Sequence, residues 1–468
     1  MCVVMKKTKI ICSIGPSSCN VETMVKMVES GMDVARINFS HATEEEKENV
    51  VSTVKKVRKI TGKNIAILYD TKGPEFRNGN LENGSIELVE GALIRIVKEK
   101  VLGNSTMFSV NHKEAIDSIN VGNTILLENG LMKLEVISKE SDGITCKVIT
   151  PGILGNKKSL SVPKVKLDIP FISKEDREDI IYAIKHDADF IALSFVSSKE
   201  DVCDVRKILR EYNSNIKIIS KIESVTGIDN LDDIISVSDG IMVARGDLGV
   251  EVPMEDLPYY QQLIINKCRQ NGKIAIVATE MLESMKKNIR PTRAEVTDIS
   301  YAVATGADAV MLSGETTTGK NPIEAVKYMA KVCESTEKHI EYVVDSSWVS
   351  KDIKGSIASS VVNSANLLSA KMIIVATMTG KTASVISNLR SKSIIIANCI
   401  SESVARSLAL NWGVYTSITT IHNTTDEIVD DAIDYAINSK DISKDDIVII
   451  TGGFPQNKDT NFMKIEKI

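Results

Sequence analysis

Short apolar runs rich in β-branched residues alternate with helical patterns along most of the chain, and this alternation constrains the fold more than any other feature. Eight such runs lie at residues 9–12, 34–38, 65–69, 190–193, 216–219, 240–243, 274–277 and 309–312. Alternating strands and helices predict βαβ units and a parallel sheet. Eight units in roughly 240 residues match a closed (β/α)8 TIM barrel. A doubly wound open sheet is the alternative arrangement.

The texture of the sequence changes twice. From about residue 76 to 161 the helical period disappears, and Asn-Gly or Asp-Gly pairs at 78–79, 83–84, 129–130 and 142–143 separate short β-type runs. Such pairs are hairpin signals. They predict a small all-β domain, a β-barrel, inserted at 72–166 into a barrel formed by 1–71 and 167–342. A polar stretch at 345–355 then precedes a second α/β unit over 343–468, with strands near 372–375, 394–396, 413–415, 447–450 and 462–465.

Composition excludes several classes of function. The net charge is −5, 43% of residues are hydrophobic, and no long Lys/Arg run occurs, so we expect no nucleic-acid surface. The eight cysteines form no Cys-x-x-Cys pair, which indicates reduced thiols rather than zinc or disulfides. No signal-peptide pattern and no membrane-length apolar run is found, so we expect a cytoplasmic protein that does not bind membranes.

Charged and polar residues follow nearly every apolar run. In a barrel of this kind the catalytic residues come from the carboxyl ends of the strands. The strand-end residues are Arg36, Asn38, Ser40, Asp70, Thr71, Ser194, Lys221, Glu223, Arg245, Asp247, Thr279, Ser313 and Glu315.

Lys221 and Glu223 lie two positions apart, so on an extended strand they share a face. They predict either a surface ion pair, which contributes little, or a metal carboxylate beside a fixed cation. Asp247, at the next strand end, supplies a second carboxylate and favours the metal site. Two such oxygen donors suit Mg²⁺ or Mn²⁺, whereas Arg36, Arg77 and Lys221 suit a phosphate group.

Two glycine-containing stretches indicate close backbone approach to a ligand. At 245–249 (RGDLG), a helix beginning after the strand would offer free N–H groups to a carboxylate; an ordinary strand-to-helix turn is the alternative. At 379–382 (TGKT), the second α/β unit has a stretch that resembles a phosphate-binding loop. It is not a complete Walker A motif, and a tight turn is the alternative.

Seven ordered motifs carry a resemblance to one enzyme family. They are TKIICSIGP at 8–16, ARINFSH at 35–41, DTKGPE at 70–75, SKIE at 220–223, ARGDLG at 244–249, PTRAE at 291–295 and MLSGET at 311–316. On these motifs the chain resembles pyruvate kinases over nearly its full length. The resemblance implies a glycolytic phosphotransferase that converts phosphoenolpyruvate and ADP to pyruvate and ATP. It also implies Mg²⁺ (or Mn²⁺) and K⁺ as cofactors, a homotetramer, and closure of the inserted domain as a lid.

The resemblance also assigns roles to individual residues. Lys221, Thr279 and Arg36 would be catalytic, and the substrate would bind to Arg36, Lys221, Gly246, Asp247 and Thr279. Glu223 and Asp247 would hold Mg²⁺, and Asn38, Ser40, Asp70 and Thr71 would hold K⁺, with Glu75 marking K⁺ dependence. The nucleotide would contact Asn38, Arg77 and Lys158, and a phosphorylated effector would bind to Thr377, Thr379, Gly380, Lys381 and Thr382. Enolate protonation through water, Thr279 or Ser313 stays open.

The chain departs from the family pattern at several positions. SLSVP at 159–163 replaces the usual GVNLP, which puts the hinge of the lid in question. Other departures are Ser197, Glu280, Tyr301, Ser391 and Ser393. The sequence ends soon after residue 464, so we expect no extra C-terminal phosphotransfer-type domain.

Two rival functions make different predictions. A Mg²⁺-dependent barrel lyase acting on 2-oxo acids would need neither the β-insert nor the nucleotide lysine Lys158. A non-catalytic regulatory paralogue would have lost Lys221, Glu223 or Asp247, yet the sequence retains all three.

Overall fold

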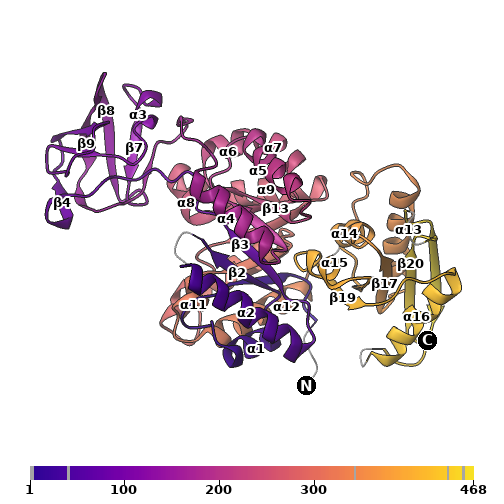
Figure 1. The fold of residues 1–468 in the computed structure, drawn as a ribbon. Helices are drawn as coiled ribbons and strands as arrows, with labels where there is room; N and C mark the ends of the chain where they lie inside the picture. The colour runs from indigo at the N-terminus through magenta and orange to yellow at the C-terminus, as the bar shows by residue number, and fades with distance from the viewer. Residues whose placement is uncertain (1–4, 40–42, 342–343, 440–441, 456–458) are drawn as a thin grey trace.

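Eight parallel strands close into a barrel at the centre of the molecule, which a computed structural model describes over residues 5–39, 43–341, 344–439, 442–455 and 459–468 (Figure 1). Around the barrel the strands are β1 (Lys9–Ser13), β2 (Val34–Asn38), β3 (Ala66–Asp70), β12 (Phe190–Leu193), β13 (Lys217–Ile222), β14 (Gly240–Ala244), β15 (Ile274–Ala278) and β16 (Ala309–Leu312). Strand β16 pairs with β1 and closes the sheet. The predicted barrel is confirmed, and the open sheet is excluded.

Helices surround the strands and bury one apolar stripe each against them. The longer ones are α1 (Val21–Ser30), α2 (Glu44–Thr61), α4 (Lys174–Lys185), α5 (Lys199–Glu211), α9 (Leu257–Gln270), α10 (Arg293–Ala304) and α12 (Pro322–Glu337). Ser173 caps α4 and Gly31 ends α1 with a positive φ of 122°, both as the sequence predicts.

Four aspartates fix the register of alternate strand pairs at the amino ends of the strands. Each one precedes a strand, and its carboxylate accepts the backbone N–H of a residue at the start of the neighbouring strand. The pairs are Ile10 N to Asp33 at 2.8 Å, Ile67 N to Asp189 at 2.9 Å, Ile218 N to Asp239 at 2.9 Å and Ala275 N to Asp308 at 2.8 Å. These bonds satisfy buried strand-end donors that lack a partner in the ladder.

The β-insert, at the upper left of Figure 1, leaves the barrel after β3 and returns before α4. Its strands are β4 (Ser85–Leu88), β5 (Leu93–Val97), β6 (Met107–Ser109), β7 (Thr124–Leu127), β8 (Met132–Glu140), β9 (Gly143–Thr150), β10 (Gly152–Gly155) and β11 (Leu160–Ser161). Six of these form one sheet, and β4 pairs with β10.

Only two of the four predicted hairpin turns form hairpins. Asn129-Gly130 joins β7 to β8 with positive φ at both residues, and Asp142-Gly143 joins β8 to β9. The hairpin prediction was wrong at 83–84, where Asn83 and Gly84 lie in the 3₁₀ turn η1 (Glu82–Gly84), and at 78–79, where Asn78 bridges to Val110. Asn-Gly favours left-handed backbone in any tight turn, whether or not two strands follow.

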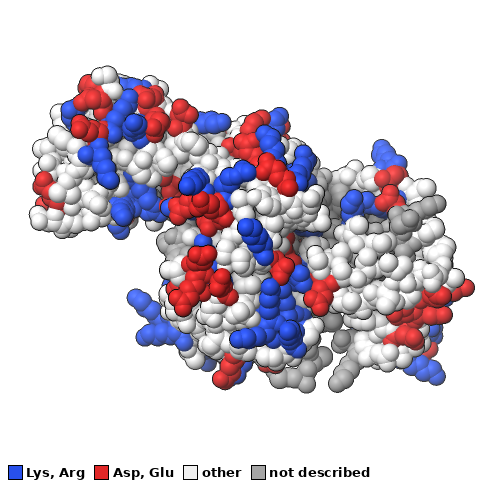
Figure 2. Space-filling model, viewed as in Figure 1, with Lys and Arg blue, Asp and Glu red and all other residues white. Residues whose placement is uncertain are grey.

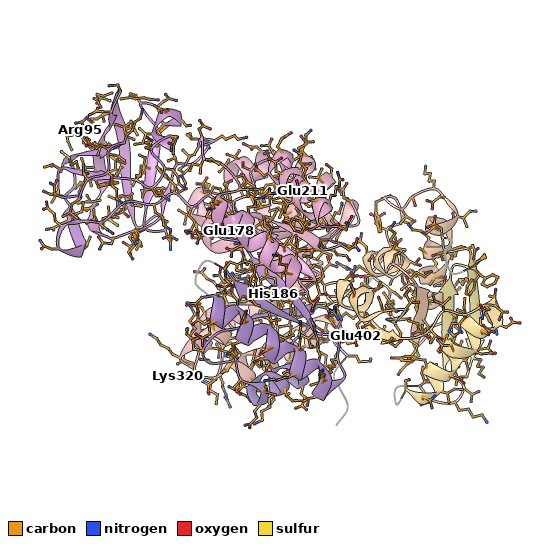
Figure 3. The ribbon with its side chains drawn as sticks, viewed as in Figure 1. Arg95, Glu178, His186, Glu211, Lys320 and Glu402 are labelled. Carbon is orange, nitrogen blue, oxygen red and sulfur yellow. The ribbon has the colours of Figure 1, made fainter. Side chains whose placement is uncertain are left out.

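The C-terminal unit is a five-stranded sheet in the order β19-β18-β17-β20-β21, with β21 antiparallel at the edge. The strands are β17 (Met372–Thr377), β18 (Ile394–Cys399), β19 (Val414–Ile418), β20 (Ile447–Gly452) and β21 (Phe462–Lys467), with helices α13 (Ile353–Leu367), α14 (Lys381–Asn388), α15 (Glu402–Ser407) and α16 (Thr425–Asn438). Helix α15, with Glu402 labelled in Figure 3, lies on the side that faces the barrel.

Two ion pairs, of which the Arg390–Asp308 pair is buried and the Arg406–Asp189 pair is largely buried, attach this unit to the amino ends of the barrel strands. Arg390 Nη1 lies 2.8 Å from Asp308, and Arg406 Nε lies 2.9 Å from Asp189. Two of the four strand-capping aspartates, Asp189 and Asp308, therefore also anchor the C-terminal unit at the end of the barrel opposite to the carboxyl ends of the strands.

The surface carries both signs of charge. On the face drawn in Figure 2, basic and acidic side chains are interspersed over the barrel and the β-insert. Among the described helices, none has the length and apolar character needed to cross a bilayer.

Candidate active site

A pocket of about 180 Å³ opens at the carboxyl ends of the barrel strands. It brings together seven of the predicted site residues: Arg36, Asn38, Asp70, Lys221, Glu223, Asp247 and Thr279. Gly246 and Thr71 adjoin the pocket through bonds to Thr279 and Ser194. Arg77, Lys158 and the predicted effector loop lie outside the pocket lining, and Ser40 lies outside the described residues.

Lys221, on β13, is the centre of the charge network. Its ammonium nitrogen lies 2.8 Å from Ser194 Oγ, 3.0 Å from Glu223 Oε1 and 3.1 Å from Asp70 Oδ1. Burial disfavours the charge, but the carboxylates of Asp70 and Glu223 outweigh burial and raise the pKa of Lys221 above its ordinary value. Lys221 and Glu223 do pair, but the pair is buried and shared with a third group, unlike a surface ion pair.

Two carboxylates converge beside this lysine. Burial raises the pKa of Glu223 to about 7; the Lys221 charge lowers it, and the Asp247 charge raises it further. Removal from water also raises the pKa of Asp247, although the Lys221 charge and a hydrogen bond with Glu223 lower it in part. The buried carboxylate of Glu223 and the more accessible carboxylate of Asp247, both of which resist ionisation, are the donor set that a divalent cation would satisfy.

The backbone after β12 supports Glu223. Phe195 has a φ of +57°, which is unusual for a residue with a side chain, and its N–H donates to Glu223 Oε2 at 2.6 Å. No group of three or more His, Cys, Asp or Glu side chains positioned to hold a metal ion occurs among the described residues. A metal here would therefore take its remaining ligands from substrate and water.

Asp70 joins the lysine to an arginine. Arg36 Nε donates to Asp70 Oδ2 at 2.7 Å, and Arg36 Nη1 donates to Ser13 Oγ at 2.7 Å. Burial opposes ionisation of Asp70, but Arg36 and Lys221 hold its pKa below the ordinary range. Asp70 is thus a charged, buried carboxylate between two cations, all three lining the pocket.

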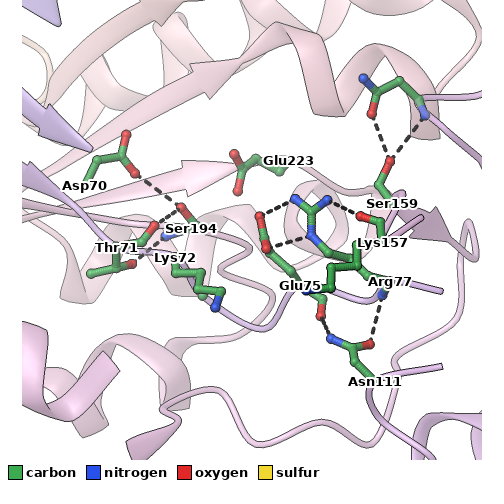
Figure 4. Close-up of polar contacts among 12 residues, drawn as sticks. Asp70, Thr71, Lys72, Glu75, Arg77, Asn111, Lys157, Ser159, Ser194 and Glu223 are labelled. Carbon is green, nitrogen blue, oxygen red and sulfur yellow. Dashed lines mark hydrogen bonds and ion pairs between the residues drawn. The ribbon is translucent and has the colours of Figure 1, made fainter. Parts of the chain in front are cut away.

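Three of the four predicted K⁺ residues, Asn38, Asp70 and Thr71, lie at the ends of β2 and β3. Asn38 lines the pocket, and Thr71 is buried beside Asp70. Ser194 Oγ donates to the Thr71 carbonyl oxygen at 2.6 Å, and Ser194 N donates to Thr71 Oγ1 at 3.2 Å (Figure 4). A hydroxyl, carbonyls, an amide and a carboxylate are hard oxygen donors of the kind that alkali cations need.

Thr279 lies in a strained turn after β15. Thr279 and Glu280 have positive φ values of 69° and 53°. Arg245 Nη2 donates to the Thr279 carbonyl oxygen at 2.5 Å, and Arg245 Nη1 is 2.6 Å from Asp298 on α10. Helix α8 (Arg245–Glu251) begins directly after β14, and Gly246 N donates to Thr279 Oγ1 at 2.9 Å.

Two of the three predicted nucleotide contacts, Arg77 and Lys158, lie where the β-insert leaves and rejoins the barrel, and the third, Asn38, lies on β2. Arg77 forms a two-bond pair with Glu75, with both N···O distances at 2.8 Å, and donates to the Lys157 carbonyl oxygen (Figure 4). Lys158 Nζ lies 2.6 Å from Glu128 Oε1. Both cations are partly exposed.

The predicted effector loop follows β17 in the C-terminal unit. Gly380 has a φ of +79°, and its N–H donates to Thr377 Oγ1 at 2.9 Å. Helix α14 begins at Lys381, so the loop ends at a helix amino terminus. Thr382 Oγ1 contacts Thr460 Oγ1.

Sequence reasoning assigned no role to several supporting groups. Ser194 was recognised as a strand-end residue only, although its position after β12 was the available signal. The Phe195 N–H, Ser13 and Asp298 gave no signal, because their function depends on contacts between distant segments.

Comparison with known proteins agrees with this geometry. The family described as pyruvate kinase, barrel domain, matches residues 5–326, and the family described as pyruvate kinase, alpha/beta domain, matches residues 355–466. The pyruvate kinase of Geobacillus stearothermophilus is 45% identical over 472 residues, which covers 99% of this chain and 80% of the relative. That of Bacillus licheniformis is 42% identical over 469 residues, covering 98% and 80%. A solved pyruvate kinase from Cryptosporidium parvum superposes with a TM-score of 0.95 at 41% identity, covering 99% of this chain and 97% of the other.

Proposed function

The chain belongs to the pyruvate kinase family and transfers the phosphoryl group of phosphoenolpyruvate to ADP, and we propose that it does so in the pocket lined by Lys221, Glu223 and Asp247. The observation that carries this assignment is the buried Lys221 ammonium held between Asp70, Glu223 and Ser194. Phosphoryl transfer depends on positioning and charge neutralisation rather than on covalent help, and such a preorganised cation supplies both.

Lys221 and Arg36 neutralise the phosphoryl group. Arg36 is fixed through Asp70 and Ser13, so its guanidinium presents its remaining N–H groups to the pocket without further ordering. Lys221 stabilises the charge on the moving group and on the enolate left behind. Because both cations are already ordered by Asp70, little reorganisation is needed during the reaction.

Glu223 and Asp247 hold Mg²⁺ or Mn²⁺ in this proposal. The fit rests on the buried carboxylate of Glu223 and the more accessible carboxylate of Asp247, whose ionisation is disfavoured without a cation. When bound, the cation supplies positive charge that orients and polarises the substrate oxygens. The Phe195 N–H fixes the second oxygen of Glu223, so the carboxylate keeps its orientation.

The substrate carboxylate binds at the start of α8. Gly246 and Asp247 have backbone N–H groups there, and the Gly246 N–H, which donates to the Thr279 hydroxyl in the structure, would turn to the substrate carboxylate. Arg245 holds the strained Thr279 turn in place. Thr279 and Ser313 both line the pocket, so either hydroxyl can order the water that protonates the enolate.

Asn38, Ser40, Asp70 and Thr71 hold K⁺, and Glu75 makes the activity K⁺-dependent. Support comes from the cluster of oxygen donors at the ends of β2 and β3. Rates in K⁺ and in a bulky organic cation of equal ionic strength test this role. Equal rates would contradict it.

Arg77, Lys158 and Asn38 contact the nucleotide, and the insert at 72–166 closes over the pocket to exclude water. The insert lies in the sequence between the two segments of the barrel domain, 1–71 and 167–342. Support comes from the position of Arg77 and Lys158 at the two ends of the insert. Alanine at Arg77 is expected to raise KM for ADP more than KM for phosphoenolpyruvate.

The C-terminal unit, 343–468, binds a phosphorylated effector at Thr377, Thr379, Gly380, Lys381 and Thr382. The protein is a cytoplasmic homotetramer in this proposal, and it does not engage nucleic acid or membranes. Seven described cysteines are free, which is compatible with a reducing compartment. Light scattering after size-exclusion chromatography tests the tetramer; a monomer at micromolar concentration would contradict it.

A coupled assay tests the reaction itself. Purified protein with phosphoenolpyruvate, ADP, Mg²⁺ and K⁺ is expected to release pyruvate only when ADP is present. The control is Lys221→Met under the same conditions. Absence of ADP-dependent pyruvate from the wild-type protein would refute the proposed function.

A further inference from the structure

Ser194, directly after β12, contacts Lys221, and no role has been assigned to it so far. It is 3% exposed. Its hydroxyl oxygen lies 2.8 Å from Lys221 Nζ and 2.6 Å from the Thr71 carbonyl oxygen. Asp70 Oδ1 is farther, at 3.2 Å.

The chemistry of the partners fixes the direction of these bonds. An ammonium group only donates, so Ser194 Oγ accepts from Lys221. The serine proton then goes to the Thr71 carbonyl oxygen, its shortest acceptor contact. Lys221 thus has three N–H donors and three acceptors, of which Asp70 and Glu223 are charged and Ser194 is the neutral one.

We propose that Ser194 is a positioning residue for Lys221. By accepting one N–H bond, it keeps that donor from turning fully toward the carboxylates of Asp70 and Glu223. Those carboxylates are stronger acceptors, and closer pairing with them would withdraw the ammonium from the phosphoryl group. The inference rests on the proposed catalytic role of Lys221.

The local backbone makes this arrangement rigid. Ser194 N donates to Thr71 Oγ1, so two reciprocal bonds tie the ends of β3 and β12 together. A Cβ placed on Gly73 would lie 2.8 Å from the Ser194 carbonyl oxygen, so the chain packs closely over this residue. The serine therefore has little freedom to move, and smaller or equal-sized replacements suit the site.

The test uses Ser194→Ala and Ser194→Cys, with Ser220→Ala as the matched control. Ser220 is a fully buried serine on β13 whose hydroxyl bonds to Ser238, away from the pocket. Loss of one hydrogen bond to a charged group is expected to lower kcat about tenfold in Ser194→Ala. KM for phosphoenolpyruvate should change by less than about twofold in Ser194→Ala. The kcat of Ser194→Cys should lie between those of Ser194→Ala and wild type. The kcat of the Ser220→Ala control should match wild type.

A double-mutant cycle with Lys221→Met separates a role through the lysine from a structural one. If Ser194 acts through Lys221, adding Ser194→Ala to Lys221→Met should not lower kcat further. An equal loss in both backgrounds, or a wild-type kcat in Ser194→Ala, would overturn the inference. Failure of the proposed function itself is distinguishable, because the wild-type protein would then lack activity.

A second observation, independent of the first, concerns Leu410 of the C-terminal unit. This side chain lies between α15 and β19, is fully buried, and packs in the same apolar cluster as the inward-facing residues of the barrel strands. Three members of that cluster, Met242, Ala278 and Met311, also line the catalytic pocket. A continuous apolar column therefore runs from the C-terminal unit to the floor of the pocket.

The same segment also contacts the predicted effector loop. A Cβ on Gly380 would lie 3.0 Å from Leu408 Cδ2, so the loop packs directly on the residue two positions before Leu410. Arg406, just before this segment, pairs with Asp189 of the barrel, and Arg390, which follows α14, pairs with Asp308. We infer that the Leu410 side chain supports the apolar floor of the pocket, so that a side chain of the C-terminal unit helps to shape the site.

The test compares Leu410→Ala with Leu389→Ala, an equal deletion at a buried position that packs only within the C-terminal core. Both variants should lower Tm. At a temperature where both are folded, only Leu410→Ala should change KM for phosphoenolpyruvate, by about two- to thirtyfold. A wild-type KM in Leu410→Ala, or the same KM change in Leu389→Ala, would overturn the inference.

Discussion

Replacing Glu223 with glutamine is expected to stabilise the metal-free protein at alkaline pH while abolishing its activity. Burial, with Asp247 adding to it, raises the pKa of Glu223 from 4.5 to about 7 in the folded protein. The folded state therefore binds this proton more tightly than the unfolded state. The contribution of the protonated Glu223 carboxyl to the free energy of unfolding is fully present below about pH 4.5 and is lost as the pH rises through about 7.

The expected size follows from the two pKa values. The difference between 4.5 and about 7 corresponds to about 3 kcal/mol of unfolding free energy at pH 8. For a domain of a few hundred residues, that is a Tm shift of roughly 6 °C. Glutamine keeps the size of the side chain and an oxygen that accepts the Phe195 N–H, so few contacts are lost. At pH 5 the gain in unfolding free energy of Glu223→Gln over wild type should fall below about 1 kcal/mol.

The assay is thermal unfolding in a chelator at pH 5 and at pH 8, followed by addition of Mg²⁺. Wild type should gain stability from Mg²⁺ at pH 8 by mass action, and Glu223→Gln should not. Glu178→Gln, on the exposed face of α4 (Figure 3), is the matched control and should follow wild type. A Glu223→Gln variant that is no more stable than wild type at pH 8 would refute the reasoning.

Three further outcomes follow from the same contacts. Lys221→Met should lower kcat on the order of 100- to 1000-fold, as expected for loss of one preorganised donor, and near-normal turnover would remove Lys221 from the mechanism. Arg390→Leu leaves Asp308 buried without its arginine and should cost about 3–5 kcal/mol in urea unfolding; the Asp308→Asn, Arg390→Leu double variant should recover part of that loss. Arg77→Ala should raise KM for ADP in steady-state assays, and an unchanged KM would place the nucleotide elsewhere.

Most of the barrel was predictable because its strands are buried on both sides. Runs such as 216–219 and 309–312 carry β-branched residues without alternation, and they end in polar residues that mark the carboxyl edge. The hairpin turns of the insert were only half predictable. Asn83-Gly84 and Asn129-Gly130 have similar local conformations, and only the pairing of distant strands distinguishes a hairpin from an isolated turn.

The site was predictable where each residue type has its own chemistry. Lys221, Glu223, Asp247 and Arg36 carry charges at strand ends, so the fold alone brings them together. Asp298 was not predictable, because it supports Thr279 only through Arg245 and lies in the middle of a helix. Contacts of this kind depend on packing between elements far apart in sequence.

The pairing of Lys221 with Glu223 fits a metal site in which each charged group has an oppositely charged partner while the metal is absent. A buried carboxylate without a cation is costly, and so is a buried ammonium without an anion. In the structure Lys221 satisfies Glu223 only in part, since Asp70 and Ser194 share the same ammonium and the pKa of Glu223 stays high. In the proposed function Glu223 and Asp247 would hold a divalent cation, and its charge would compensate that of Glu223 in place of Lys221. Lys221 would then keep Asp70 and Ser194 as partners and turn its third N–H group to the substrate.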